Sequence, residues 1–470
     1  MAVGYAALDA NTTASDNTAV GYNSLTANTT GTKNAALGTY TLTANSTGNY
    51  NTAVGWAALD LNTTASYNTA VGYNSLAVNT TGLENTAVGF AALSANTTGL
   101  NNTAVGANAL DANTTGVNNT AIGINALSAA TTAEANVAVG VNALLLSTGG
   151  YNTALGGFAL RSNTTAVSNT AVGYNSLYEN TTGTGNVAVG ALTLDANTTA
   201  SNNTAVGYTS LTANTTGVDN TCVGYGTMAG NTTGNYNVAM GTNAMSSSSA
   251  GPQRNVAIGY AALQVIANGL YNSGVGMYAL NGVTTGSSNT AMGYGAGSST
   301  VTTGSYNVLI GASTQLGAAG QENQIVIGYS ATGKGSSTGF INPNGGNVYQ
   351  GNNSSSWATV SDRRIKKNIV DNTTGLDAIN QIQVKNFEYK LPEEISEGLT
   401  EKDAVEKEGL QVGVIAQEIE AILPDVVTEL ESGCKSVNPD NLTWYLVNAV
   451  KELSAKCDSL QNEINILKGN

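Results

Sequence analysis

Residues 68–82 read NTAVGYNSLAVNTTG, and this unit decides the fold because it recurs along most of the chain. One glycine marks each unit, and successive glycines are 17 residues apart except for one step of 16 and two of 18. A fixed period of this length predicts a stacked architecture, in which each unit buries its faces against its neighbours. Twenty copies fill the chain to about residue 330, and we call their glycines the ladder glycines: Gly4, Gly21, Gly38, Gly55, Gly72, Gly89, Gly106, Gly123, Gly140, Gly156, Gly173, Gly190, Gly207, Gly224, Gly241, Gly259, Gly276, Gly293, Gly311 and Gly328.

One unit is too short for a helix, a strand and two loops, so we expect one coil of a β-solenoid with two short strands and two turns. Strand alternation places Thr69, Val71 and Tyr73 on one face and Ala70 and Gly72 on the other. Twenty coils at ~4.8 Å each predict a shaft of roughly 95 Å. We expect a trimer around a common axis to cover the small Ala and Gly faces.

Three further rows recur with the glycines. Leu or Met lies four residues after nearly every one. Asn lies seven residues after the early ones, where stacked amides can form a hydrogen-bonded ladder: Asn11, Asn28, Asn45, Asn62, Asn79, Asn96 and Asn113. Aromatic residues often follow the glycine directly, which suits a sugar-stacking stripe or, in the interpretation we favour, a packed core or surface ladder. The Asn-Thr-Thr triplets match the N-glycosylation pattern, but turn residues explain them more simply.

The NTAVG or NVAVG core resembles the head repeats of trimeric autotransporter adhesins and the repeat shafts of phage tail fibres. The resemblance covers about 330 residues. It implies an architecture and says nothing of a ligand.

Charge divides the chain near residue 360. The 470 residues include 56 Gly, 5 Pro and no His, and the net charge is −14. Only 4 basic and 10 acidic residues precede residue 361, whereas the last 110 residues hold 12 basic and 20 acidic ones. The acidic balance argues against nucleic-acid binding, which needs basic surface. We expect residues 1–329 to form the shaft, 330–360 a tip or neck, and 361–470 a separate domain.

The three cysteines, Cys222, Cys434 and Cys457, are too few for a disulfide framework and favour synthesis in a reducing compartment. The sequence shows no apolar run of membrane-spanning length and no signal-peptide pattern. The chain begins inside its first repeat, so we expect either a fragment or a separate protein that anchors the N-terminus.

Three blocks follow the shaft: SDRRIKKN at 361–368, GVIAQEIEAILP at 413–424 and YLVNAVKEL at 445–453. In this order they resemble the intramolecular chaperone domain of endosialidases, phage tailspikes and tail fibres, which also occurs in the myelin regulatory factor. The resemblance implies a domain that trimerises, guides folding of the fibre before it and then cuts itself off. It places the cut between Val360 and Ser361, with Ser361 as nucleophile and Lys366 as general base.

The residues themselves agree with that chemistry. Without histidine a Ser-His triad is impossible, and a Ser–Lys pair is the available alternative. Lys366 must lose its charge to accept the Ser361 proton, and burial on assembly would achieve this. The alternative interpretation is that residues 361–368 are a charged, solvated entry from a strand into a helix.

The C-terminal residues predict a trimerisation helix at 438–468, with Asn438 as its cap and Pro439 at its first position. Leucines recur every seven residues, with Val450, Cys457 and Ile464 between them, which predicts three coiled-coil heptads: Leu446, Leu453, Leu460 and Leu467. A single amphipathic helix on a globular core is the alternative. We interpret Cys457 as a packed hydrophobe near the axis, not as a metal ligand.

Two shorter predictions concern the middle of this domain. A helix over 414–423 should bury Ile415, Ile419, Ile422 and Leu423 and end at Pro424. The acidic run 393–408 should be a solvated loop.

Taken together, the sequence predicts a mainly β, homotrimeric viral tail fibre for host-surface attachment, made in the host cytoplasm and assembled into the virion. The expected partners are two further copies of the chain, a virion protein at the N-terminus and a host glycan or protein. We expect no cofactor, no metal, no nucleic acid and no membrane insertion. Enzyme activity would be at most one self-cleavage per chain. The alternatives are a bacterial surface adhesin and a capsule-degrading tailspike, although we find no paired acidic site for glycosidase work.

Overall fold

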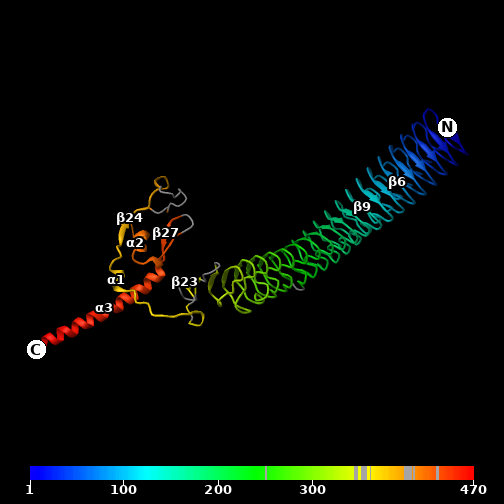
Figure 1. Ribbon diagram of the computed structural model, residues 1–470. Coiled ribbons are helices and arrows are strands. Elements are labelled where there is room, and N and C mark those ends of the chain that lie inside the picture. The colour runs from blue at the N-terminus through cyan, green and yellow to red at the C-terminus, as the bar shows by residue number, and fades with distance from the viewer. Residues whose placement is uncertain are drawn as a thin grey trace. The chain divides into compact units, whose positions relative to one another are not determined.

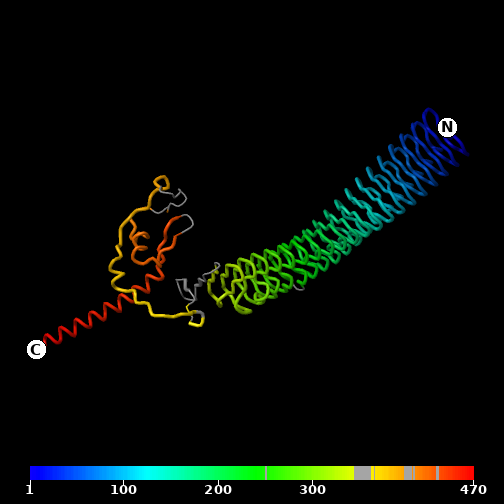
Figure 2. Tube along the Cα trace, in the orientation of Figure 1, coloured from blue at the N-terminus to red at the C-terminus, as the bar shows by residue number. Residues whose placement is uncertain are grey.

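In a computed structural model the chain forms two compact units, Met1–Val360 and Ser361–Asn470 (Figures 1 and 2). The structure describes residues 1–248, 251–342, 348–350, 357–359, 361, 363–395, 405, 408–429 and 433–469. Each unit is considered by itself below.

The first unit is a parallel β-solenoid, with one short strand in each coil. Every strand from β1 to β20 pairs in parallel with the strand one coil later, so that Ala70 of β5 lies opposite Ala87 of β6. The twenty strands are β1 (Ala2–Val3), β2 (Thr18–Val20), β3 (Ala35–Leu37), β4 (Thr52–Val54), β5 (Thr69–Val71), β6 (Thr86–Val88), β7 (Thr103–Val105), β8 (Thr120–Ile122), β9 (Val137–Val139), β10 (Thr153–Leu155), β11 (Thr170–Val172), β12 (Val187–Val189), β13 (Thr204–Val206), β14 (Thr221–Val223), β15 (Val238–Met240), β16 (Val256–Ile258), β17 (Ser273–Val275), β18 (Thr290–Met292), β19 (Val308–Ile310) and β20 (Ile325–Gly328).

The expected second strand in each coil is wrong. Left-handed residues bend the rest of the coil at regular positions, as Ala57 (φ 52°), Leu59 (φ 52°) and Tyr67 (φ 63°) do in one coil. A chain that turns this often cannot hold an extended run. Outside the named strands, the described residues form only isolated bridges, such as that between Gln315 and Thr332.

The expected role of the alanine face is also wrong. Ala70 points into the coil and is fully buried, where it joins the fully buried Leu76 in the continuous shaft core. Thr69 and Val71 flank Ala70 on the outer face and are half-buried. The alanines therefore form the interior of each single coil and are not available for contact between chains.

The ladder glycines let successive coils approach each other closely. Gly156 has φ +139°, and a Cβ atom built on it would lie 2.5 Å from the carbonyl oxygen of Gly173 in the next coil. An L-residue with a side chain rarely adopts this backbone conformation, and the clash here is with backbone that cannot move aside. The same close contact repeats from coil to coil, which explains why glycine recurs at this position in every repeat.

Gly156→Ala is expected to destabilise the shaft by at least about 2 kcal/mol, because both the backbone conformation and the contact with Gly173 are lost. Gly157 is the matched control, because a Cβ built there would meet only the Tyr174 ring at 3.8 Å. Thermal unfolding followed by circular dichroism should show a lower midpoint for Gly156→Ala and a nearly unchanged one for Gly157→Ala. Equal midpoints in the two variants would contradict this account.

Two ladders of buried asparagine run through the coils. The predicted ladder is confirmed: Nδ2 of Asn62 donates to Oδ1 of Asn45 at 2.8 Å, and the pattern repeats in neighbouring coils. A second ladder, not predicted, uses the Asn that begins each NTAVG core. In it, Oδ1 of Asn85 accepts the backbone N–H of Asn102 at 3.0 Å, and Nδ2 of Asn85 donates to the carbonyl of Gly99 at 2.9 Å. These amides satisfy backbone groups at the corners of the coil that would otherwise be buried without a partner.

The aromatic residues that follow the ladder glycines lie on the surface and stack on one another. The rings of Trp56 and Tyr73 are 4.7 Å apart and nearly parallel, and those of Tyr73 and Phe90 are 5.4 Å apart. All three side chains are exposed. The rings therefore form a surface ladder and are not part of a packed core, and stacking adds about 0.5–1.5 kcal/mol per pair to the cohesion of adjacent coils.

The parallel stack continues past the last ladder glycine. Strand β21 (Gly339–Asn342) pairs in parallel with β20, and Phe340 is buried in the same core as the coils before it. Two strands then reverse direction: β22 (Val348–Gln350) pairs antiparallel with β21, and β23 (Trp357–Thr359) pairs antiparallel with β22. We call β1–β21 the shaft.

The second unit is a small α+β domain that ends in a long helix. Strands β24 and β25 pair antiparallel, as do β26 and β27. The elements of the second unit are, in order, η1 (Arg363–Ile365), α1 (Leu376–Ile379), β24 (Lys385–Phe387), η2 (Pro392–Glu394), β25 (Gln411–Gly413), α2 (Ala416–Glu420), η4 (Pro424–Val426), β26 (Val427–Glu429), β27 (Lys435–Val437) and α3 (Pro439–Lys468). None of the helices in the described parts of the chain combines the length and the apolar character of a membrane span.

The helix predictions for this unit were met in different degrees. Helix α3 is confirmed: it begins at Pro439, and Oδ1 of Asn438 accepts the backbone N–H of Asp440 at 2.9 Å. The helix expected over 414–423 is shorter, because Ile415 is extended and α2 covers only Ala416–Glu420. Most of the acidic run 393–408 lies outside the described residues.

Candidate functional site: a serine–lysine pair and its supporting core

The structure brings Ser361 and Lys366 together. The Nζ of Lys366 donates to the Oγ of Ser361 at 2.8 Å. The single 3₁₀ turn η1 lies between the two residues, and the N–H of Lys366 donates to the carbonyl of Arg363 at 3.2 Å. This turn folds the chain back on itself, so that residues five apart in sequence meet through their side chains.

The pair is open to water in the single chain. Ser361 and Lys366 are both exposed, as are Arg364 and Lys367. The segment is therefore charged and solvated, as the alternative interpretation expects, but it enters a 3₁₀ turn and not an α-helix. Val360, the residue on the other side of the predicted cut, lies outside the described residues.

A small apolar core supports this segment's domain. Ile419 of α2, Leu423, Val426 of η4 and Tyr445 of α3 are its buried members. Helix α1 also packs against α3. Ile419 and Leu423 belong to the second sequence block and Tyr445 to the third, so the two blocks meet in one core.

The third block also binds a loop that is distant in sequence. The Nδ2 of Asn448 donates to the carbonyl oxygens of Asn372 at 2.9 Å and Thr374 at 3.1 Å. One turn later on α3, Oε2 of Glu452 accepts the backbone N–H of Leu376 at 2.9 Å and so satisfies the first turn of α1. These contacts tie the loop that follows the serine–lysine segment to α3.

Tyr445 adds a third polar contact from the same helix. Its hydroxyl donates to Asp425, and this bond, followed by burial, raises the pKa of Tyr445 above that of a free phenol. A raised folded-state pKa stabilises the fold while the phenol keeps its proton. That contribution is lost as the pH rises through the pKa of Tyr445.

Glu452→Ala is expected to weaken α1 by about 1 kcal/mol, because the partly buried backbone N–H of Leu376 at the start of the helix loses its acceptor. The most direct measurement is amide hydrogen exchange at Leu376 in the full chain, which should become several-fold faster. Asp458→Ala removes an exposed carboxylate further along α3 and serves as the control. Unchanged exchange at Leu376 in the Glu452 variant would show that the contact does not hold α1.

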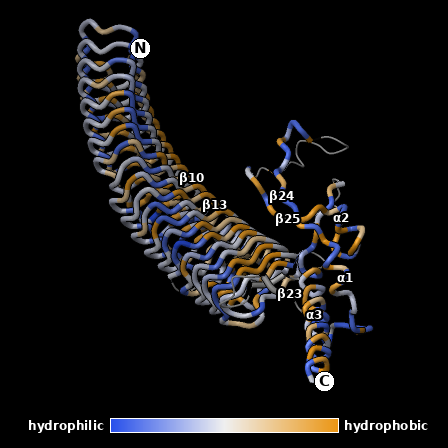
Figure 3. The backbone as a smooth tube through the Cα atoms, turned by 90° about the vertical axis from the view of Figure 1, so that its left-hand side faces the viewer, coloured by the Kyte–Doolittle hydropathy of each residue, from blue (hydrophilic) through white to orange (hydrophobic). Residues whose placement is uncertain are grey.

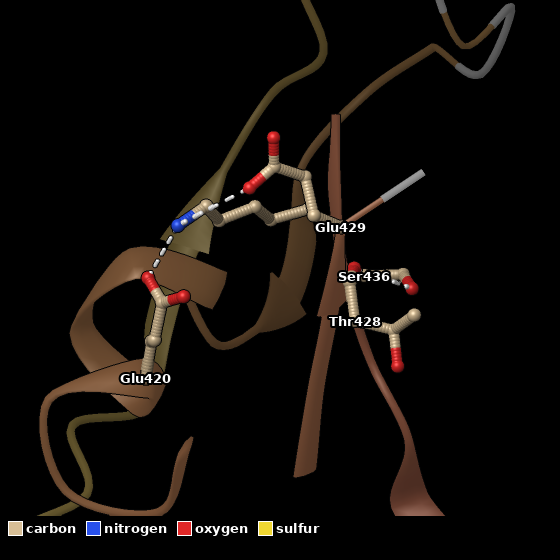
Figure 4. Close-up of polar contacts among 5 residues, drawn as sticks. Glu420, Thr428, Glu429 and Ser436 are labelled. Carbon is tan, nitrogen blue, oxygen red and sulfur yellow. Dashed lines mark hydrogen bonds and ion pairs between the residues drawn. The ribbon is translucent and has the colours of Figure 1, made fainter. Parts of the chain in front are cut away.

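Ion pairs fasten the second hairpin to α2. The Nζ of Lys435 in β27 lies 2.5 Å from a carboxylate oxygen of Glu420 and 4.0 Å from one of Glu429 (Figure 4). The bond to Glu420 is the main reason that the pKa of Lys435 is raised. Across the hairpin, Oγ of Ser436 donates to the carbonyl of Thr428 at 3.3 Å. A further pair, Lys385 with Glu418, joins β24 to the same helix.

The heptad side of α3 is exposed along its length. In the single chain the exposed fraction is 50% for Leu453, 58% for Leu460 and 76% for Leu467, and the intervening Val450 is 65% exposed. Cys457 is also exposed. We call these side chains, with Leu446 and Ile464, the α3 seam.

Residues 361–428 match the family model described as the chaperone of endosialidase. The match begins at Ser361, which is also the first residue of the second compact unit. No solved structure matches the chain. A chaperone domain of this family joined to a β-solenoid of about twenty coils fits a protein of the phage tail fibre or tailspike kind.

Sequence reasoning found the serine–lysine pair but missed the residues that hold its domain together. Asn448 and Glu452 lie in a block that was noted only as a resemblance, and their partners are 74 to 76 residues away. The available signal was their spacing of three and seven residues from Tyr445, which places all three side chains on one face of α3. Within the described residues, no three His, Cys, Asp or Glu side chains come close enough to share a metal ion.

Proposed function

We propose that this chain is a homotrimeric viral tail fibre whose C-terminal unit directs trimerisation and then cuts itself from the shaft. The observation that carries the proposal is the chaperone match at residues 361–428, which follows a solenoid of twenty coils and the three strands β21–β23. The shaft would hold the fibre's contact surface away from the virion, for attachment to a host surface.

The C-terminal unit answers a problem that the shaft creates. Nearly identical coils can pair out of register between chains at little energetic cost, and solenoid folding can begin at many places. A trimeric seed at one end fixes the alignment before the shafts associate. The α3 seam supports this role, because its heptad spacing is that of a coiled coil and its apolar side chains are exposed in the single chain.

The serine–lysine pair supplies the proposed cleavage. Neutral Lys366 takes the hydroxyl proton of Ser361 while Oγ attacks the carbonyl carbon of Val360. The C–N bond breaks, the proton passes from Lys366 to the departing nitrogen of Ser361, and an ester joins Val360 to Oγ. Water then adds to the ester carbon with Lys366 as base, and Oγ regains its proton. The products are a carboxylate at Val360 and a free amine at Ser361.

Assembly would control this step. Lys366 is exposed in the single chain. Neighbouring chains that covered it would favour the neutral amine, so cleavage would follow trimerisation. The attack of Ser361 on the Val360 carbonyl is intramolecular, because the two residues are adjacent in the same chain. The reacting groups therefore do not have to meet by diffusion.

Immunogold labelling with an antibody against the shaft tests the assignment to a fibre. We expect gold along the tail of the virion that carries this gene. Label on a bacterial surface instead would support the adhesin alternative.

Incubation of the trimer with host polysaccharide should leave the polymer length unchanged, whereas shortened polysaccharide chains would show a glycan-degrading tailspike.

A further inference from the structure

The outer face of the shaft's strands carries an unbroken aliphatic row. We define the outer strand row as the residue immediately before each ladder glycine; in all twenty coils it is Val, Ile, Leu or Met. Its members flank the buried alanine on the outside of the strand, and Leu37, Leu155 and Met292 are 52%, 47% and 53% exposed. Figure 3 shows hydrophobic residues following the side of the shaft that carries the β10 and β13 labels.

Charge is excluded from this face. No residue of β1–β20 is charged. The charged side chains of the shaft lie in the turns, as Asp60, Glu84 and Asp111 do. An uncharged strand face that carries a continuous aliphatic row, with the charges confined to the turns, is the pattern of a surface that is covered by another protein.

The strand face is large enough to form a protein interface. Twenty strands at ~4.8 Å spacing, each three residues or about 10 Å long, give an uncharged strip of roughly 900 Å². The strip contains the outer strand row and, on the other side of the buried alanine, a second outward residue that is most often Thr. A standard protein interface covers about 800 Å² on each partner, so the strip is sufficient for stable association.

We infer that the outer strand row is the surface through which three shafts pack around their common axis. This inference rests on the proposed homotrimer and names its contact face. A partner that covers the whole row must present apolar groups at the same spacing as the coils. A second copy of this chain, aligned in register, has the same spacing because its coils are identical. The inward-facing alanines cannot serve, because each coil already buries them.

Chemical cross-linking tests the contact face. In a background with Cys434→Ser and Cys457→Ser, we place cysteine in the outer strand row at Val88→Cys or Val206→Cys. The matched controls are Thr98→Cys and Thr216→Cys, exposed turn residues ten positions later in the same coils. Each full-length protein is treated with a short bis-maleimide, run on a denaturing gel, and measured in parallel by light scattering. Cysteine is close to valine in size, so the strand variants should fold.

Covalent dimers are expected in both strand variants, at ten times or more their fraction in the turn variants. Dimers mainly in the turn variants would overturn the contact face while leaving the trimer intact. Three chains per particle without cross-links in either pair would also overturn it. A single chain per particle would instead contradict the proposed function on which the inference rests.

Discussion

Ser361→Ala should yield a single full-length chain of 47.4 kDa, whereas the unaltered protein should separate into two pieces that divide before Ser361. The variant removes the oxygen that lies 2.8 Å from the Lys366 amine and that is proposed to attack the preceding carbonyl. Lys366→Ala should have the same effect, because the serine proton then has no acceptor. Intact-mass measurement of the purified proteins reads out both results, and we expect self-cleavage to fall by at least 10³-fold in each variant.

The neighbouring lysine separates chemistry from charge. Lys367→Ala removes one exposed positive charge next to the pair and should leave cleavage intact. Lys366→Arg keeps the charge but supplies a group that stays protonated, and it should be as inactive as Lys366→Ala. Cleavage that persists in Ser361→Ala or in Lys366→Ala would refute the assignment of that residue.

Two charges on the α3 seam are expected to abolish trimerisation. Leu453→Asp with Leu460→Asp puts like charges from three chains at the centre of the proposed coiled coil, where burial of an unpaired carboxylate is strongly unfavourable. Both leucines are exposed in the single chain, so the fold of the C-terminal unit should survive. Light scattering should then find single chains or aggregates in place of three-chain particles. Self-cleavage should fall with trimerisation, because the single chain lacks the neighbouring chains that would cover Lys366.

The matched control carries the same charges on the opposite side of α3. Ala455→Asp with Asn462→Asp lies in the same helical turns and faces away from the seam. This variant should assemble and cleave as the unaltered chain does. Loss of trimers in both variants would point to a general effect of charge on the helix and would argue against the seam.

Sequence patterns predicted the parts of the fold that depend on repetition and local chemistry. The glycine period gave the coil length, the spacing of Asn45 and Asn62 gave the ladder between coils, and Asn438 with Pro439 gave the start of α3. Each of these signals comes from residues that are close together in the sequence or from a strict repeat.

The errors concern directions and distant contacts. Alternation separated Ala70 from Val71 correctly, but it could not tell which face is inside, because both residue types are apolar. The second strand failed because ordinary residues such as Ala57 and Leu59 adopt left-handed conformations that only the stacked coil enforces. Glu452 and Leu376 meet across 76 residues, and no local pattern reports such a contact.

The number of chains in one particle tests the central claim most directly. Light scattering on the Ser361→Ala variant, which should stay full length, is expected to give three times the chain mass of 47.4 kDa together with a strong β-sheet signal in circular dichroism. A particle of one chain that retains the same β-sheet signal would contradict the account.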